Sequence, residues 1–367
     1  MTKNETVKQP PIGGVLWPHE VAFLALLAVA YHYTDAKFRG GGSLPVMLFG
    51  AVVIAAFPVL AYRCKDEWQV LPNKGLFFVL AGAWTTLFAF LGNATFGYVQ
   101  SASLFAWMFD AYTSPLAEEQ YGLLLPFVVL VLFWWKRKEL VAKPLEFWWP
   151  GAILFVGALF LHIIGFIAQQ PKLSLIAFII GIYALTGLAW GKNWLKTSFF
   201  PFFLLIFCIP ASDSADWLTL RLRLLVSWIV SIIAHCGLAP DLIRDGTQLY
   251  DAQHTFAYEV AAACSGIRSL VALLALTSIY GFITFKSPWK RAVMIASALP
   301  LAVLGNVARL CFTIMVAETF GQDAGKAVET YAGFVTFAVA IGCVFLISRW
   351  LEKTEPQTSS TPEAASL

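Results

Sequence analysis

The stretch Tyr258-Glu-Val-Ala-Ala-Ala-Cys-Ser-Gly-Ile-Arg-Ser-Leu270 places a cysteine and an arginine at the start of a long apolar run. Ser265 is of a type that caps the first free amides of a helix, and Gly266 lets another backbone approach closely. We therefore expect a helix with Cys264 at its N-terminus and Arg268 one turn along the same face. The helix dipole and the arginine would favour the thiolate, the form of cysteine that attacks carbonyls. The alternative from this stretch alone is a buried structural cysteine beside an anchoring arginine.

The rest of the chain is too apolar for a soluble domain. Of its 367 residues 59% are hydrophobic and 13% are charged, and they include 31 Phe and 14 Trp. Runs of about 20 apolar residues, each long enough to cross a hydrocarbon core of about 30 Å, recur along its length. The sequence predicts an all-α polytopic integral membrane protein in contact with the lipid bilayer. The net charge of +3, without a basic stripe interleaved with aromatic residues, predicts no nucleic-acid partner.

We expect about ten membrane-spanning helices and one amphipathic outer segment. The spans are predicted near 15–33, 44–62, 76–97, 121–135, 147–168, 173–190, 197–211, 267–285, 291–316 and 329–350. The fourth run is short, and the region 93–120 also suits a re-entrant piece around Asp110. We divide the chain into an N-terminal transmembrane region (1–196), a C-terminal core (197–350) and a tail (351–367) whose Thr, Ser, Pro and Glu content predicts disorder.

Lysine and arginine counts predict the orientation. With the N-terminus inside, cytoplasmic segments hold 16 of these residues and outer segments 7, while Arg268 and Arg309 fall within spans. Both termini are therefore predicted to be cytoplasmic. The long segment 212–263 then lies outside. An amphipathic helix along the membrane surface is predicted from Leu218 to Ala234, with Arg221 and Arg223 in it, followed by extended chain or a short hairpin that leads to Cys264.

Helix lengths bring several polar residues to one level. At 1.5 Å per residue, Arg309 and Arg268 each lie about 27 Å from the cytoplasmic ends of their spans, and Cys264 about 33 Å. Glu329, at the start of the last predicted span, lies about 30 Å from the cytoplasmic end, and Asn306 stands one turn before Arg309. Two arginines within spans cost roughly 2.5–3.5 kcal/mol each, which favours a functional cluster. The alternative is that their charged groups reach the lipid headgroups and do nothing else.

The sequence does not indicate a metal or another cofactor. Its six cysteines contain no CxxC pair, and its five histidines show no spacing typical of metal ligands.

These residues carry a family resemblance. Ala263-Cys-Ser-Gly-Ile-Arg-Ser-Leu270, followed by Gly305-Asn-Val-Ala-Arg309, resembles the signature of exosortases and archaeosortases, which are membrane-embedded transpeptidases. The run Phe200-Pro-Phe-Phe-Leu-Leu-Ile-Phe-Cys-Ile-Pro210 is also similar, so the resemblance covers roughly 197–350. It implies that Cys264 is the nucleophile, that Arg309 is the second essential group, and that a third residue lies at the start of the last span.

The third position departs from the family pattern. Exosortases commonly carry a histidine four residues before a glycine here, and archaeosortases use an arginine, whereas this chain has Glu329-Thr-Tyr-Ala-Gly333. Three alternatives follow. Glu329 itself is the general base, His254 supplies an imidazole from the outer segment, or the activity is altered or lost.

The resemblance implies cleavage of a C-terminal sorting signal through a thioester on Cys264. Arg268 and Asn306 would be auxiliary hydrogen-bond donors. The implied partners are secreted proteins that end in a short motif, a transmembrane helix and a basic tail, as in the PEP-CTERM class. The implied location is the bacterial inner membrane, with the active site facing the periplasm or exterior.

Two other functions compete with a transpeptidase. A polytopic transporter would place its polar residues near the middle of the bilayer. A non-catalytic factor in surface-polysaccharide assembly would share the fold but need no thiol.

Overall fold

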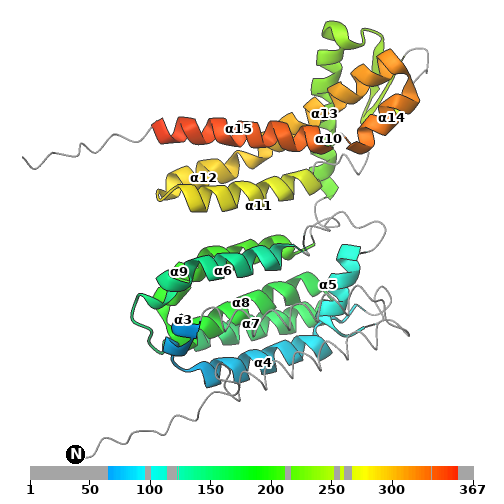
Figure 1. The fold of residues 1–367 in the computed structure, drawn as a ribbon. Helices are drawn as coiled ribbons and strands as arrows, with labels where there is room; N and C mark the ends of the chain where they lie inside the picture. The colour runs from blue at the N-terminus through cyan, green and yellow to red at the C-terminus, as the bar shows by residue number, and fades with distance from the viewer. Residues whose placement is uncertain are drawn as a thin grey trace, which may run out of the picture. The chain divides into compact units, whose positions relative to one another are not determined.

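The structure, a computed structural model, describes residues 65–95, 101–113, 122, 124–210, 216–251, 257–259, 267–331 and 333–353. The chain forms two compact units, which we call unit 1 (Met1–Pro210) and unit 2 (Ala211–Leu367). Both are built mainly from helices (Figure 1). The prediction of a largely helical chain is confirmed.

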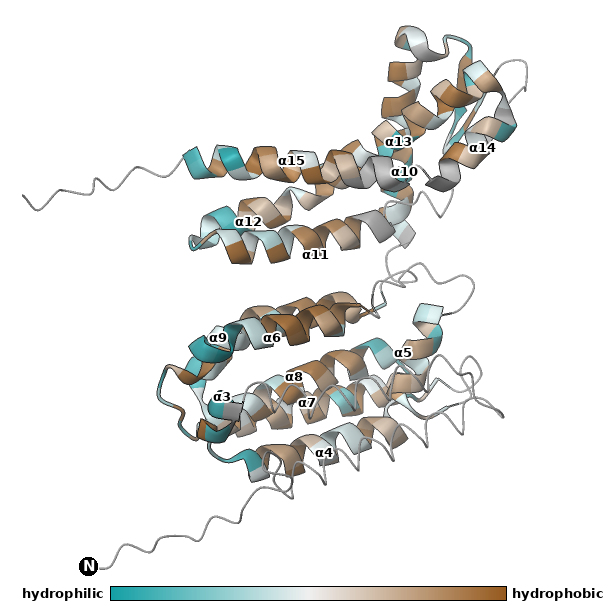
Figure 2. Ribbon diagram, viewed as in Figure 1, coloured by the Kyte–Doolittle hydropathy of each residue, from teal (hydrophilic) through white to brown (hydrophobic). Residues whose placement is uncertain are grey.

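In the described part, five helices are long and apolar enough to cross a membrane, and hydrophobic residues make up much of the helical ribbon (Figure 2). They are Lys74–Leu91, Pro150–Ile167, Pro171–Trp190, Trp217–Gly237 and Pro288–Phe320. A multi-pass membrane protein is thereby supported. The total of about ten spans stays a prediction, and the expected spans 15–33 and 44–62 lie outside the described residues.

The regular elements in the described part of unit 1 are all helices. Its elements are α3 (Lys65–Val70), α4 (Lys74–Leu91), α5 (Leu104–Thr113), α6 (Leu125–Val141), α7 (Pro150–Ile167), α8 (Pro171–Trp190), α9 (Lys192–Leu204) and the 3-10 helix η2 (Leu205–Cys208). Proline occupies the first turn of α6, α7 and α8, where its missing amide removes no helical hydrogen bond.

Helices α4, α7 and α8 share the main core of unit 1. Glycines at their crossings allow close approach, since a Cβ on Gly151 would stand 2.7 Å from the amide nitrogen of Leu188 in α8. Buried His162 of α7 contacts buried Ser174 of α8, with 3.1 Å between Nδ1 and Oγ. These two polar side chains between the apolar helices therefore satisfy one another.

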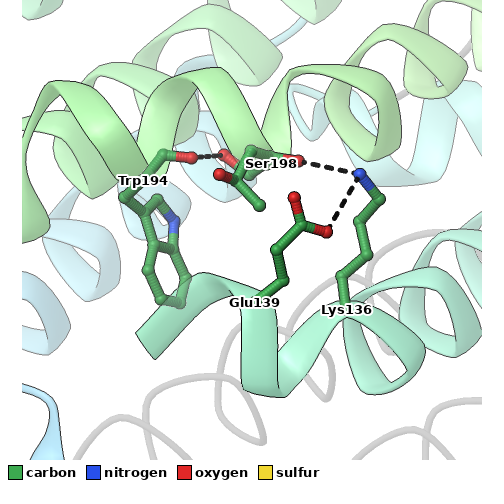
Figure 3. A network of polar contacts seen from close by, with 5 residues as sticks. Lys136, Glu139, Trp194 and Ser198 are labelled. Carbon is green, nitrogen blue, oxygen red and sulfur yellow. Dashed lines mark hydrogen bonds and ion pairs between the residues drawn. The ribbon is translucent and has the colours of Figure 1, made fainter. Parts of the chain in front are cut away.

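Helices α6 and α9 pack together on the other side of α8. The Lys136 ammonium lies 3.8 Å from the Glu139 carboxylate and donates to the Thr197 carbonyl at 3.4 Å, which links α6 to α9 (Figure 3). Helix α9 runs without a break through residue 196, and with η2 it packs against α6 and α8 within unit 1. The stretch 197–210, which the sequence grouped with the C-terminal core, therefore lies in unit 1.

The region 93–120 contains the short helix α5. Before it, the chain folds back on itself, because the Asn93 amide donates to the Ala102 carbonyl and its side-chain nitrogen donates to the Ser101 carbonyl, both at 2.8 Å. Asp110 lies within α5 and is half-buried. The Tyr112 hydroxyl donates to the Cys208 carbonyl, which ties α5 to η2.

Unit 2 combines helices with one small sheet. Its elements are α10 (Asp216–Ile233), the π-helix η4 (Ala234–Leu238), β1 (Leu242–Asp245), β2 (Gln248–Asp251), β3 (Ala257–Glu259), α11 (Ile267–Thr284), α12 (Pro288–Ala296), α13 (Ala298–Phe320), α14 (Gln322–Tyr331) and α15 (Gly333–Lys353). The strands form an antiparallel sheet in the order β1-β2-β3. Gly246, with φ of 58°, allows the two-residue turn between β1 and β2.

The described part of the segment before Cys264, residues 216–251 and 257–259, has the secondary structure expected for it. Helix α10 agrees with the predicted helix at 218–234 to within two residues at each end. The extended chain predicted after it forms the small sheet. Helix α10 is apolar enough to cross a membrane. Within unit 2, however, it runs across the direction of α11 and α15 (Figure 1), as a helix lying along a membrane surface would.

Two hydrophobic cores organise unit 2. The first, the bundle core, joins α11, α12, the first part of α13, α15 and the start of α10; its buried members are Leu222, Leu270, Leu273, Phe285, Met294, Ala298, Leu301, Ala302, Ala340, Val344 and Leu351. The second, the cap core, joins the rest of α10 with η4, β1, β2 and the second part of α13; its buried members are Val226, Val230, Ala234, Ala239, Leu242, Leu249, Val307, Leu310, Ile314 and Ala317. Helices α10 and α13 therefore pass from one core into the other.

The predicted last span is wrong at its start. The run that was expected to be continuous from 329 is divided into α14, which ends at Tyr331, and α15, which begins at Gly333. Gly321, with φ of 88°, ends α13 and allows the chain to turn into α14, which packs back against α13. Glu329 therefore belongs to the last turn of α14 rather than to the spanning helix.

Candidate active site

Helix α11 begins at Ile267, three residues after Cys264, as the sequence predicted. A Cβ on Gly281 of α11 would lie 3.4 Å from the Met294 side chain of α12, which marks one point where the antiparallel chains stand side by side. Arg309 is fifteen residues after Met294, and residue 266 is fifteen before Gly281. Because both chains rise about 1.5 Å per residue, Arg309 lies at the level of the N-terminus of α11.

The start of α15 lies at the same level. The Tyr280 hydroxyl of α11 donates to the Ser348 hydroxyl of α15 at 3.0 Å, and these two helices run in the same direction. Residue 267 lies thirteen residues before Tyr280, and residue 335 lies thirteen residues before Ser348. These two residues are at or near the first residues of α11 and α15. Three elements therefore converge at one end of the bundle: the N-terminus of α11, the N-terminus of α15 and the Arg309 turn of α13.

Arg309 occupies a distinctive place on α13. It continues a stripe of small buried residues at helical spacing, Ala298, Ala302 and Gly305, and the two alanines belong to the bundle core. Beyond this stripe the bundle ends and the cap core begins, at Val307. The half-buried guanidinium of Arg309 thus stands where the two cores meet, and it takes part in polar or electrostatic contacts there.

Asn306 lies one turn before Arg309 and is 6% exposed. A carboxamide and a guanidinium at this spacing lie on adjoining parts of one helix surface and can donate to the same group. Both are fixed on a helix that two cores hold in place. Such donors are suited to stabilising negative charge that develops on an oxygen atom.

The remaining predicted site residues are only partly described. The backbone of Arg268 lies in the first turn of α11 and that of Glu329 in the last turn of α14, while both side chains lie outside the described part. Cys264 and His254 lie outside the described residues altogether. The structure therefore places Arg309 and Asn306 together, and the backbones of Arg268 and Glu329 on elements next to the same level. Contacts between their side chains and Cys264 stay predictions.

A second arginine, Arg223, lies near the boundary between the two cores. Arg223 of α10 lies between Leu222 of the bundle core and Val226 of the cap core, so α10, like α13, carries an arginine at the passage between the cores. In the sequence it contributed to the count of outer positive charges and to the predicted amphipathic helix. A helical projection would have separated it from Arg221, because two residues turn a helix by about 200°.

The site residues belong to no metal-ligand cluster in the described part of the chain. There, no group of three or more His, Cys, Asp or Glu side chains is arranged to hold a metal ion.

Comparison with known proteins agrees with the motifs quoted above. A protein-family model described as a transmembrane exosortase (Exosortase_EpsH) matches residues 114–346. The match begins well before residue 197, so it also includes α6, α7 and α8. No curated protein and no solved structure matches the chain.

Proposed function

The chain belongs to the transmembrane exosortase family, and from this we propose that it is a membrane-embedded cysteine transpeptidase that cleaves C-terminal sorting signals through a thioester on Cys264. Its family membership indicates a role in protein sorting at the membrane. The nucleophile, the cleavage step and the substrate class are the parts that we propose.

The observation that carries this proposal is the convergence at one end of unit 2. Arg309 lies at the level of the α11 N-terminus, and Cys264 precedes that helix by three residues. A donor that is fixed on one helix thus stands level with the start of another, to which the thiol is attached by a short length of chain. The N-terminus of α11 also favours an anion, because its first amides are not bonded within the helix.

In the proposed reaction the Cys264 thiolate attacks the carbonyl carbon of the scissile peptide bond. A carbon–sulfur bond forms, and the carbonyl electron pair moves to the oxygen, where Arg309 and Asn306 donate hydrogen bonds. When the tetrahedral intermediate collapses, the carbon–nitrogen bond breaks and the leaving amine takes a proton from the general acid, Glu329 or His254. An acceptor nucleophile then attacks the thioester and releases the thiolate.

The proposed substrates are secreted proteins that end in a short motif, one transmembrane helix and a basic tail. Their helix would lie in the bilayer beside unit 2, so that the scissile bond is at the end of the bundle where α11 and α15 begin. The distribution of lysine and arginine supports an orientation in which this end faces the periplasm or exterior. The bacterial inner membrane is proposed as the location from the family alone. Arg268, in the first turn of α11, is an auxiliary donor in this proposal.

The test is processing of reporter proteins in cells. Each reporter carries the C-terminal segment of one secreted protein from the same genome that ends in such a motif, span and tail. We expect Cys264→Ser to abolish removal of the segment, and Cys236→Ser, at an exposed cysteine of the same unit, to leave it unchanged. Processing that continues with Cys264→Ser would refute the proposed function and favour a transporter or a non-catalytic assembly factor.

A further inference from the structure

The end of α6 and the start of α9 form a basic surface on unit 1. The two helices run antiparallel, with the Phe133 ring centroid 5.6 Å from that of Phe202 and the Lys136 Nζ atom 3.4 Å from the Thr197 carbonyl oxygen. The last turns of α6 therefore lie beside the first turn of α9, and Figure 2 shows hydrophilic residues at this end of both helices. The exposed lysines in and next to these turns are Lys138, Lys143, Lys192 and Lys196.

These four lysines form no ion pair or hydrogen bond with the described residues. The neighbouring cations differ, since Lys136 pairs with Glu139 (Figure 3) and Arg137 pairs with Glu67 at 3.3 Å. Two exposed carboxylates remain at this end of the described part, one in α3 and one in the loop after α6, and they are Asp66 and Glu146. The surface therefore keeps an excess of positive charge.

The exposed surface changes from apolar to basic at the same level on both helices. On α6, Val131, Trp135 and Lys138 follow one face at helical spacing, and Val131 and Trp135 are 61% and 55% exposed. On α9, Lys196 and Phe199 are one turn apart, and Phe199 is 49% exposed. In the antiparallel register given above, Trp135 lies level with Phe199 to within about one residue. Lys138 lies level with Lys196 in the same way.

On each helix an exposed aromatic ring is thus followed by a cation about 4.5 Å nearer the end. This order is typical of a protein that passes from hydrocarbon into lipid headgroups, where aromatic rings lie at the boundary and lysines reach beyond it. The group that covers this surface has to match an apolar strip and the cations next to it. An anionic phospholipid has both parts, whereas a soluble acidic protein would cover the cations and leave Trp135 and Phe199 in water.

We propose that the lysines at the α6–α9 end of unit 1 bind anionic phospholipid headgroups, with the acyl chains lying along Trp135 and Phe199. Lys138 is on the side of α6 away from α9, and Lys196 is on the side of α9 away from α6, so the surface binds separate lipids rather than one. Anionic lipid attracts each lysine that lies near the membrane surface. This inference does not depend on the chemistry proposed for Cys264.

The test measures lipid binding to the full-length protein in neutral detergent by native mass spectrometry, with phosphatidylglycerol or phosphatidylcholine added. We expect the apparent Kd for phosphatidylglycerol to be lower by about tenfold or more. The triple variant Lys138→Gln, Lys192→Gln, Lys196→Gln should bind both lipids alike, with unchanged thermal unfolding in neutral detergent because these side chains are exposed. The matched control, Lys286→Gln, Arg349→Gln, Lys353→Gln, removes three exposed cations of unit 2 and should keep the preference.

Three results would overturn the proposal. Wild-type protein that binds both lipids alike would do so, whatever the variants do, and would leave a soluble acidic partner as the candidate. An equal loss of preference in the control variant would show attraction to total charge rather than binding at this surface. Glycerol phosphate that displaces phosphatidylglycerol at equal concentration would show that the headgroup alone is bound and that Trp135 and Phe199 take no part.

Discussion

The charged side chains at the two ends of unit 2 have different bonding partners. At the end formed by α12 and the last turns of α11 and α15, the charged groups bond to the protein itself. The Lys290 ammonium, 5% exposed, donates to the Leu351 carbonyl at 2.7 Å, and the Arg291 guanidinium donates to the Phe285 carbonyl at 2.7 Å. At the end formed by α10 and the second part of α13, the Arg223 Nε and the Thr313 hydroxyl have no partner among the described residues.

We interpret this difference as one between residues that stabilise the fold and residues that take part in the proposed reaction. Cations at helix C-termini bond the last carbonyls and oppose the helix dipole, so Lys290 holds α15 in register with α11 and α12. The α10 end instead holds Arg309 and Asn306, the donors in the proposed reaction. The comparison predicts that substitutions at the α10 end change chemistry, whereas those at the α12 end change stability.

The largest effect is expected at Arg309. Replacement by Ala removes the proposed oxyanion donor, so processing should fall by about 10²–10³ with little change in thermal stability. Arg309→Lys keeps the charge but loses the planar fork of donors, and it should fail as well if two donors are used. Rates are measured on the reporter with protein purified in detergent. A fully active Arg309→Ala would remove this residue from the site, and a fully active Arg309→Lys would show that charge alone suffices.

A smaller loss is expected at Glu329. If this carboxylate is the proton acceptor, Glu329→Gln should lower processing by about tenfold or more, and Glu329→His should restore part of it. His254→Ala is the companion variant. Normal processing with Glu329→Ala, together with loss in His254→Ala, would identify the histidine of the outer segment as the base.

Some helices and site residues could be placed from the sequence alone, and others could not. The apolar runs at 147–168, 173–190 and 267–285 predicted α7, α8 and α11 within three residues, because Pro and Gly mark their ends. The common level of Arg309 and the α11 N-terminus followed from helix rise alone. The separation of α14 from α15 could not be predicted in this way, because it depends on the packing of α14 against α13. The surroundings of Arg223 could not be predicted from sequence either, since they are set by how α10 packs against α13.

At the α12 end we expect an effect on stability with little effect on rate. Lys290→Met keeps the length of the side chain but leaves the Leu351 carbonyl without this donor, and should lower the free energy of unfolding by about 1.5–3 kcal/mol. Thermal unfolding in detergent measures the loss, and the folded fraction should process the reporter within about twofold of wild type. If Lys290→Met processed the reporter much more slowly at unchanged stability, the α12 end would also contribute to the reaction, and the distinction between the two ends would be wrong.

The smallest effect is expected from the other cysteines. Cys208 is buried, Cys311 and Cys343 are half-buried, and Cys236 is exposed, while Cys64 lies outside the described residues. Replacing all five by Ala or Ser should leave processing within about twofold of wild type, because small residues can fill these positions. Complete loss of processing in a variant that still folds would show that Cys264 does not act alone.

The most direct measurement is mass spectrometry of the protein after brief reaction with a processed reporter. We expect the N-terminal part of the reporter to be attached to the Cys264 peptide through a bond that hydroxylamine cleaves, as is typical of a thioester. The adduct should be absent in Cys264→Ser and should form at least about a hundredfold more slowly in Arg309→Ala. Cleaved reporter that accumulates at the normal rate without any Cys264 adduct, or with the adduct on another residue, would contradict the central claim.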